Sequence, residues 1–244
     1  MCSFKMKYIY GPVRSRRLGL SLGVSIIPRK TCNFDCVYCQ LGGTIEKTKA
    51  PQEYIKIEDI LTELKEFILK DSELFTKINY ITLSGSGEPT LNSKIGGLIP
   101  EIKKISTCSI AVITNSSLLM DDVARKSLLE ADLIVPSLDA VKQSIFEKIN
   151  QPVDNLRVAD IIEGLIKLRR EFKGKIWLEV MLVKGLNDSP GQIKKLKEAI
   201  DRINPDKIHL NSPVRTTAEE WVKPLERKAL ERIKEILGDK CEII

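Results

Sequence analysis

The stretch that decides the interpretation of this chain is Cys32-Asn33-Phe34-Asp35-Cys36-Val37-Tyr38-Cys39. Three residues separate its first two cysteines and two residues separate the last two. A compact loop with this spacing can aim three thiolates at one point, which is the arrangement that holds an iron–sulfur cluster or a metal ion. A cubane cluster has four irons, so three thiolates leave one iron without a protein ligand and free to bind a reacting molecule.

Zinc and a disulfide are the competing interpretations of this loop. Zinc takes four protein ligands in structural sites, or three ligands and a water in catalytic ones. The chain has one histidine, His209, and its other cysteines, Cys2, Cys108 and Cys241, are scattered. A disulfide between such near neighbours would close a very small loop and leave an odd thiol. The spacing therefore favours a cluster, with zinc as the alternative.

Length and composition limit the number of domains, the location of the protein and the charge of its ligands. The 244 residues suit one large α/β domain or two small ones, and without any long polar linker we expect one domain over 1–244. No apolar run approaches the length of a membrane span, and the residues around 1–5 lack the apolar region of a signal peptide, so a cytoplasmic protein is expected. The net charge of +6 is compatible with an anionic substrate, a nucleic acid or an acidic electron donor, and selects none of them.

Hydrophobic periodicity predicts strands that alternate with helices. Strands are expected at 22–28, 78–83, 109–114, 133–140, 175–183 and 207–211, with a short edge strand at 241–244. Helices are expected at 57–68, 95–105, 141–149, 157–172 and 224–237, with another beginning at 189. Such alternation implies a parallel sheet built from strand–helix units, in which ligands bind at the carboxyl ends of the strands.

Polar segments follow these predicted strands. The turn 84–90 carries Gly87 and Glu88 after the second strand; its glycines would let a ligand approach the backbone, and a carboxylate beside them suits an ammonium group. Asn115 ends the third strand in a segment that either binds a ribose or carboxylate or caps the next helix. Ser137 and Asp139 end the fourth strand and would be costly to bury unless they face a cavity.

Later polar residues are further candidates. Glu179 is a charged residue inside the fifth strand, where it either belongs to a site or pairs with a nearby lysine. His209 alternates with Asn211 on the sixth strand and is followed by Arg215, so these residues could reach a substrate, although a lone histidine on a strand is more often structural.

The opening stretch 10–19 reads as a loop broken by glycine and proline, and it is dense in arginine. Arg14, Arg16 and Arg17 form either a solvated basic arm or a set of planar donors to a phosphate or carboxylate at the mouth of the site.

The cysteine loop resembles the cluster motif of the radical S-adenosylmethionine (radical SAM) superfamily, C-x3-C-x2-C with an aromatic residue before the last cysteine, a place that Tyr38 fills. Gly87-Glu88-Pro89 is similar to the superfamily's G-G-E-P-type segment, with Ser86 in place of one glycine, and Ser137-Leu138-Asp139 is similar to its S-L-D segment. The resemblance covers nearly the whole chain and implies an α/β fold, a partial (β/α)6 TIM-like barrel with parallel strands.

The resemblance also implies a mechanism. A [4Fe-4S] cluster on Cys32, Cys36 and Cys39 would bind S-adenosyl-L-methionine (SAM), and an electron from a donor such as ferredoxin or flavodoxin would cleave it to methionine and a 5′-deoxyadenosyl radical. Taken together, the cofactor-binding candidates are Tyr38, Gly87, Glu88, Asn115 and Ser137; the catalytic candidates are Asp139, Glu179 and His209; and the substrate-binding candidates are Arg14, Arg16, Arg17, Asn211 and Arg215.

The substrate stays open among a small molecule, a tRNA and a protein. The run 11–40, with 137–140, looks most like the branch that includes the wyosine-forming tRNA enzymes, which carry a second cluster on further cysteines. Cys2, Cys108 and Cys241 are too dispersed to suggest one. Chains of this size also resemble glycyl-radical activating enzymes, whose substrate is a protein backbone. A non-enzymatic alternative is a zinc-stabilised module that binds nucleic acid through the arginine-rich stretch.

Overall fold

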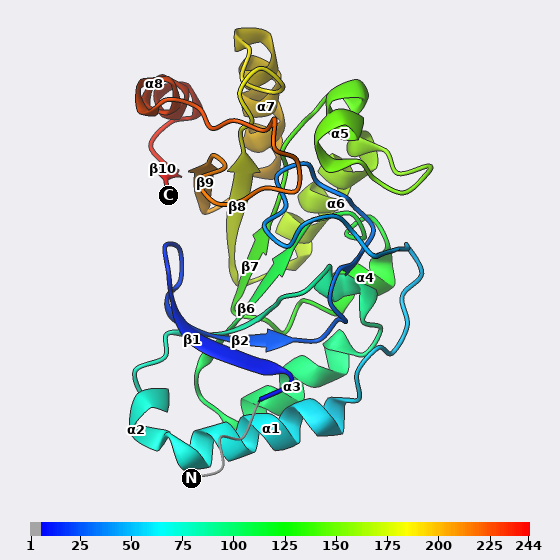
Figure 1. Ribbon diagram of the computed structural model, residues 1–244, viewed down its shortest axis with the longest axis vertical. Coiled ribbons are helices and arrows are strands. Elements are labelled where there is room, and N and C mark those ends of the chain that lie inside the picture. Colours follow the sequence, from blue (N-terminus) through cyan, green and yellow to red (C-terminus); the bar gives the residue numbers. More distant parts are fainter. Residues whose placement is uncertain (1–5) are drawn as a thin grey trace.

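Eight strands form one curved sheet in the order β1-β2-β5-β6-β7-β8-β9-β10, shown in the computed structural model of the chain (Figure 1). The structure describes residues 6–244, so Cys2 and the N-terminal residues considered above lie outside it. The strands are β1 (Ile9–Ser15), β2 (Gly19–Ser25), β5 (Tyr80–Ser84), β6 (Ser109–Thr114), β7 (Leu133–Pro136), β8 (Lys175–Met181), β9 (Lys207–Asn211) and β10 (Cys241–Ile243). A separate pair joins β3 (Thr31–Cys32) to β4 (Glu46–Lys47).

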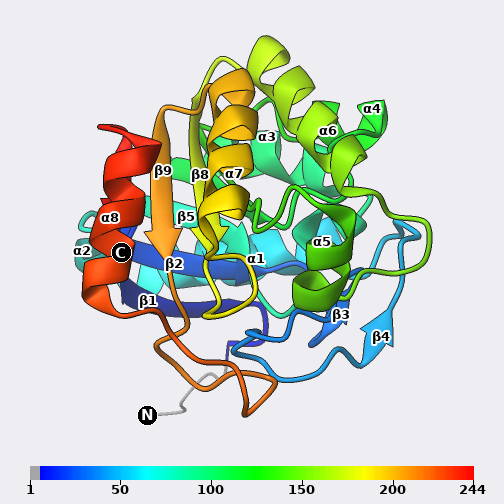
Figure 2. The same ribbon diagram turned by 90° about the horizontal axis from the view of Figure 1, so that it is seen from above.

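All neighbouring strands from β2 to β10 run parallel, and helices cover the outside of the sheet (Figure 2). The helices are α1 (Ile57–Lys70), α2 (Ser72–Phe75), the 3₁₀ turn η1 (Pro89–Leu91), α3 (Ile95–Ile105), α4 (Asp122–Lys126), α5 (Gln143–Asn150), α6 (Val158–Glu171), α7 (Pro190–Ile203) and α8 (Arg227–Leu237). Six parallel strands, β2 and β5 to β9, are each followed by a helix. The predicted partial (β/α)6 barrel is confirmed.

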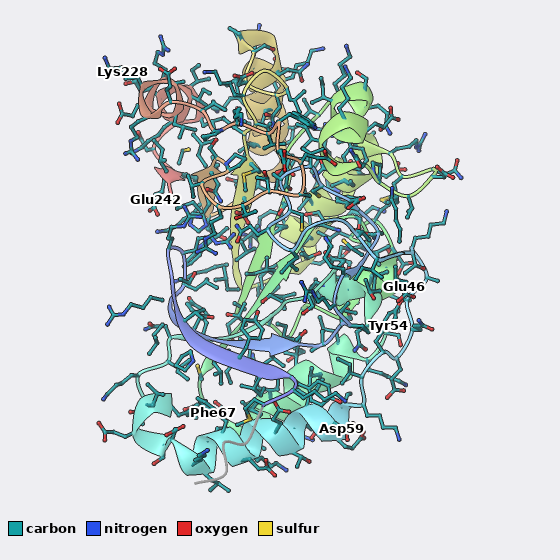
Figure 3. The ribbon with its side chains drawn as sticks, viewed as in Figure 1. Glu46, Tyr54, Asp59, Phe67, Lys228 and Glu242 are labelled. Carbon is teal, nitrogen blue, oxygen red and sulfur yellow. The ribbon has the colours of Figure 1, made fainter. Side chains whose placement is uncertain are left out.

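Apolar stripes on the helices explain why they lie against the sheet. On α1, Ile60, Leu64 and Phe67 are buried at helical spacing, while Asp59 is exposed on the far side (Figure 3). Burial of each such side chain stabilises the fold by about 1.5–3 kcal/mol. The Glu63 carboxylate of α1 also accepts hydrogen bonds from the amides of Tyr8 and Ile9, which fixes the start of β1 on this helix.

The prediction of a loop at 10–19 was wrong, because β1 occupies most of that stretch and pairs antiparallel with β2. Gly11 and Pro12 do not break the strand because β1 is an edge strand and the register shifts between Tyr10 and Val13; proline is tolerated at such edges and bulges. In both ribbon views the turn after β1 lies close to the C-terminal strand (Figures 1 and 2). The β1–β2 hairpin therefore lies along the open side of the barrel.

No helix among the described residues combines the length and the apolar character that crossing a bilayer requires.

Candidate cluster and cofactor site

A cavity of about 580 Å³ lies at the carboxyl ends of the parallel strands, which is the size of a small-molecule site. Its lining includes every residue that the sequence singled out except His209: Arg14, Arg16, Arg17, Cys32, Cys36, Tyr38, Cys39, Gly87, Glu88, Asn115, Ser137, Asp139, Glu179, Asn211 and Arg215. The topology produces this gathering, because the ends of parallel strands meet at one edge of a sheet. Cys108 and Cys241 do not line it.

Backbone contacts hold the cysteine loop in place. The amides of Asp35 and Val37 donate to the carbonyls of Asn150 and Ile149 at 2.9 Å each, at the C-terminal end of α5. The ring of Phe34 packs edge-to-face on Phe146 with centroids 5.3 Å apart. Contacts within the protein, chiefly with α5, therefore hold the loop that carries the three cysteines.

Each cysteine sulfur of the loop has a hydrogen-bond donor beside it. These donors are Lys30 Nζ at 3.2 Å from Cys39 Sγ, the Phe34 amide at 3.4 Å from Cys32 Sγ, and Asn150 Nδ2 at 3.4 Å from Cys36 Sγ. Burial raises the pKa of Cys32 to about 12 and raises that of Cys36 well above its ordinary value. A cation at the sulfurs offsets that penalty, as an iron cluster does when it binds thiolates.

Three cysteine side chains are the donors that this loop offers to a cluster or a metal ion. Within residues 6–244, no three His, Cys, Asp or Glu side chains are gathered closely enough to bind one metal ion. The three cysteines nevertheless line one cavity. Three thiolates at one cavity match the donor set of a cluster with one open iron, in which each thiolate would bind a separate iron.

The glycine-rich turn packs directly on this loop. The amides of Lys30 and Glu88 donate to the carbonyls of Ser86 and Thr31, respectively. A Cβ on Gly87 would lie 1.8 Å from the Thr31 carbonyl oxygen, closer than any two such atoms can approach. Glycine at this position therefore allows the turn to reach the cluster loop.

Glu88 is buried at the base of the cavity and joins the ends of β5 and β6. Its Oε1 accepts from the Thr90 amide at 3.0 Å, the Thr90 hydroxyl at 2.6 Å and the Thr114 hydroxyl at 2.7 Å. Among residues 6–244, its Oε2 accepts from the Asn115 amide alone, at 2.7 Å. Burial raises the pKa of Glu88, and these hydrogen bonds oppose the rise. Oε2 therefore has room for a further donor.

The polar residues after β6 contact the cluster loop and do not cap a helix. The Asn115 amide group donates to Asn33 Oδ1 at 2.7 Å and lies 3.6 Å from Cys32 Sγ. Asn33 Nδ2 donates to the Ser117 hydroxyl at 2.6 Å. Asp121 caps α4 instead, through a 2.8 Å bond from the Ala124 amide, so the alternative of a serine N-cap was wrong.

Asp139 joins the cluster loop to the sheet. Its Oδ2 accepts from the Tyr38 hydroxyl and from Asn150 Nδ2 at 2.7 Å, and its Oδ1 accepts from the Met181 amide at 2.9 Å. Burial raises the pKa of Asp139 to about 6. Asn150 contacts both this carboxylate and Cys36 Sγ, so one residue separates the aspartate from a cysteine of the loop.

Glu179 pairs with an arginine and not with the lysine that the sequence suggested. Its Oε2 accepts from Arg17 Nη1 and its Oε1 from Asn211 Nδ2 at 3.2 Å. The interaction joins the β1–β2 turn to β8 and β9 across the inside of the barrel.

His209 lies below this pair, outside the cavity lining. It is 2% exposed, its ring packs edge-to-face on Trp177 with centroids 5.3 Å apart, and its Nδ1 has no partner among the described residues. Burial, with Arg17 nearby, lowers the pKa of His209 to about 4. These contacts are those of a structural residue, which was the alternative left open by its position.

Sequence reasoning missed several residues of the site. Lys30 and Asn33 lie next to or within the cysteine motif, which is a usable signal. Asn150 carried none, because it is the last residue of helix α5, far along the chain, and reaches Cys36 only through the fold. Asn187 also carried none, although it donates to the carbonyls of Asp139 and Met181 at 2.7 and 2.8 Å.

The fold and the site together define an open parallel barrel with three cysteines at the carboxyl ends of its strands. The family model of the radical SAM superfamily matches residues 26–196, and this chain belongs to that superfamily. It is therefore a radical SAM enzyme whose cofactors are a [4Fe-4S] cluster and S-adenosyl-L-methionine, as the cysteine motif predicted.

Individual relatives show how far the similarity extends. The UPF0026 protein of Methanocaldococcus jannaschii is 37% identical over 234 residues, which cover 96% of this chain and 72% of the relative. A protein of Brachyspira hyodysenteriae named GTPase Obg is 41% identical over 239 residues, 98% of this chain, but the chain spans only 35% of that protein. A radical SAM methyltransferase structure from Sphaerobacter thermophilus has a TM-score of 0.71 at 16% identity and covers 92% of this chain and 65% of the methyltransferase. That last likeness shows the fold alone.

Proposed function

We propose that this chain cleaves S-adenosyl-L-methionine reductively and directs the resulting 5′-deoxyadenosyl radical at a substrate held in the same cavity. The observation that supports this most directly is that the cysteine loop, the glycine turn and the polar ends of β6 to β9 line one cavity. The bound cluster and SAM would supply the radical chemistry, while the protein positions them and excludes water.

Each group near the cofactor has a proposed role. Cys32, Cys36 and Cys39 hold the cluster. Glu88 accepts the ammonium group of SAM at Oε2, which has hydrogen-bonding capacity left. Tyr38, Gly87, Asn115 and Ser137 form the adjoining wall against the rest of the cofactor.

The proposal requires a one-electron donor, and a reduced ferredoxin or flavodoxin is the expected class. It places the protein in the cytoplasm, where thiols stay reduced and clusters are assembled. Asp139, predicted as catalytic, is proposed to position the cluster loop, since its carboxylate is already bound by Tyr38, Asn150 and Met181.

The test is anaerobic reconstitution with iron and sulfide, followed by reduction with dithionite and chromatographic measurement of 5′-deoxyadenosine and methionine. Alanine at Cys32, Cys36 or Cys39 should remove the cluster absorbance and the cleavage together. Cys108→Ala, outside the cavity, is the control and should retain both. Wild-type protein that carries the cluster but yields no 5′-deoxyadenosine would contradict the proposal.

A further inference from the structure

The charged residues around the cavity fall into two groups. Glu88 and Asp139 lie on the side of the cysteine loop, where each accepts hydrogen bonds from its own neighbours. The rest of the lining carries one glutamate and four arginines, namely Glu179, Arg14, Arg16, Arg17 and Arg215. This second group therefore has more positive than negative side chains.

One of these arginines is neutralised within the protein. Arg17 and Glu179 form an ion pair in which their side chains are only 22% and 11% exposed. The two charges offset each other, so Arg17 is a positioning residue that connects the β1–β2 turn to β8. Arg14, Arg16 and Arg215 remain as the excess positive charge.

The β1–β2 turn is held rigidly enough to present its arginines at fixed places. The Ser15 hydroxyl accepts from the amides of Arg17 and Leu18 at 3.2 Å each. Leu18 is 3% exposed and packs with Ala111, Leu133 and Val135 inside the barrel. These contacts replace the loose, solvated arm that was one interpretation of the sequence.

The remaining arginines have few partners in the protein. Arg14 and Arg16 make no ion pair and no side-chain hydrogen bond within residues 6–244. Arg215 donates from Nη1 to Gln40 Oε1 at 3.0 Å, which places it beside the cysteine loop. Most guanidinium donors of all three are therefore available to a ligand.

We infer that Arg14, Arg16 and Arg215 bind an oxyanion group, a phosphate or a carboxylate, of a small substrate. The inference rests on the proposed function, because it places this substrate in the cavity that SAM shares. Planar guanidinium groups bind such oxyanions through paired N–H···O bonds. A cavity of about 580 Å³ suits a small molecule, which favours a small anion over a nucleic-acid strand.

The experiment is anaerobic titration calorimetry on the reconstituted full chain with SAM present, at low salt, with inorganic pyrophosphate and citrate as probes. Arg16→Gln and Arg215→Gln should each weaken binding of the preferred probe roughly tenfold or more, the effect of one charge-assisted hydrogen bond. Arg232→Gln is the matched control, because Arg232 is exposed on α8 away from the cavity, and it should bind as the wild type does. Tighter pyrophosphate binding would identify a phosphate, and tighter citrate binding a carboxylate.

Three results would overturn the inference. The first is no binding of either probe, and the second is equal affinity of the wild type and the three variants for the probe. The third is binding of tRNA that Arg16→Gln, Arg215→Gln and the control Arg232→Gln weaken alike. SAM cleavage by the wild type is measured in parallel. Wild-type protein that cleaves SAM and binds neither anion refutes the anion site alone. Anion binding that depends on Arg16 and Arg215, in protein that holds the cluster but fails to cleave SAM, refutes the proposed radical chemistry alone.

Discussion

Replacement of Glu88 by glutamine tests two roles of this side chain, its hydrogen bonds within the protein and its proposed contact with SAM. The glutamine carbonyl can keep the position of Oε1 and its bonds to Thr90 and Thr114. Its amide group then replaces Oε2 and directs N–H toward the Asn115 amide, a buried donor that loses its acceptor. One unsatisfied buried donor costs about 1–3 kcal/mol. The lower part of this range is expected, because the neutral amide avoids the desolvation that raises the pKa of Glu88.

Glu88→Ala extends the comparison. Alanine removes the acceptors of two backbone amides, those of Thr90 and Asn115, while the two hydroxyls can turn to other partners. The expected loss is therefore about 2–6 kcal/mol, twice that of one buried donor. Both substitutions should also remove SAM binding, because neither side chain offers a carboxylate to the ammonium.

Anaerobic urea denaturation followed by circular dichroism measures the free energy of unfolding, and equilibrium dialysis with labelled SAM measures cofactor binding. Glu235→Gln, at an exposed position on α8, is the control and should change neither. A Glu88→Gln protein as stable as the wild type would refute the expected cost of leaving the Asn115 amide without its acceptor. Unchanged SAM affinity in a folded Glu88→Gln protein would refute the ammonium contact.

Two other substitutions test the barrel interior and the glycine turn. Because burial lowers the pKa of His209 to about 4, the folded state favours the neutral ring, and the unfolded chain binds the proton first on acidification. The contribution of the neutral His209 ring to the free energy of unfolding should be fully present above about pH 6.5 and fall by up to about 3 kcal/mol as the pH drops toward 4. His209→Leu should flatten the dependence of the free energy of unfolding on pH in this range, measured by urea denaturation. An unchanged slope in the variant would show that other groups cause the dependence. Gly87→Ala should lower the free energy of unfolding by about 3 kcal/mol or more, because the added Cβ overlaps the Thr31 backbone. Gly191→Ala, with nothing within 4 Å of the added Cβ, is the control and should be neutral or slightly stabilising. Equal effects of the two substitutions would contradict the clash.

The barrel was predictable because its signals are local. A buried parallel strand reads as a short apolar run, and the helices carry apolar residues at regular spacing, as Ile60, Leu64 and Phe67 do on α1. The missed strand β1 lacks both signals, since glycine and proline interrupt it and only its pairing with β2 makes it extended. Edge strands are determined by their neighbours as much as by their own residues.

Membership of the cavity was predictable, whereas the partners inside it were not. Polar residues at strand ends meet at one edge of a parallel sheet whatever their identity, so the list of lining residues followed from the pattern. Which carboxylate pairs with which cation depends on side-chain reach across the barrel. Arg17 and Glu179 lie 162 residues apart in the chain, and no sequence pattern joins them.

The hydrogen-bond partners also divide the polar residues of the cavity into two groups, those bound within the protein and those left to contact a ligand. Three hydrogen bonds occupy the Asp139 carboxylate, so the residue that resembles a substrate-side motif is engaged with the cluster loop. The groups left to contact a substrate come from the β1–β2 hairpin and the segment after β9, neither of which the cysteine or glycine motifs define. The motifs shared within the superfamily therefore account for the residues proposed to bind the cofactors, which every member of the superfamily needs. Arg14, Arg16 and Arg215, the residues proposed to bind the substrate, belong to neither the cysteine motif nor the glycine motif, and a change of substrate would be expected to begin at these positions.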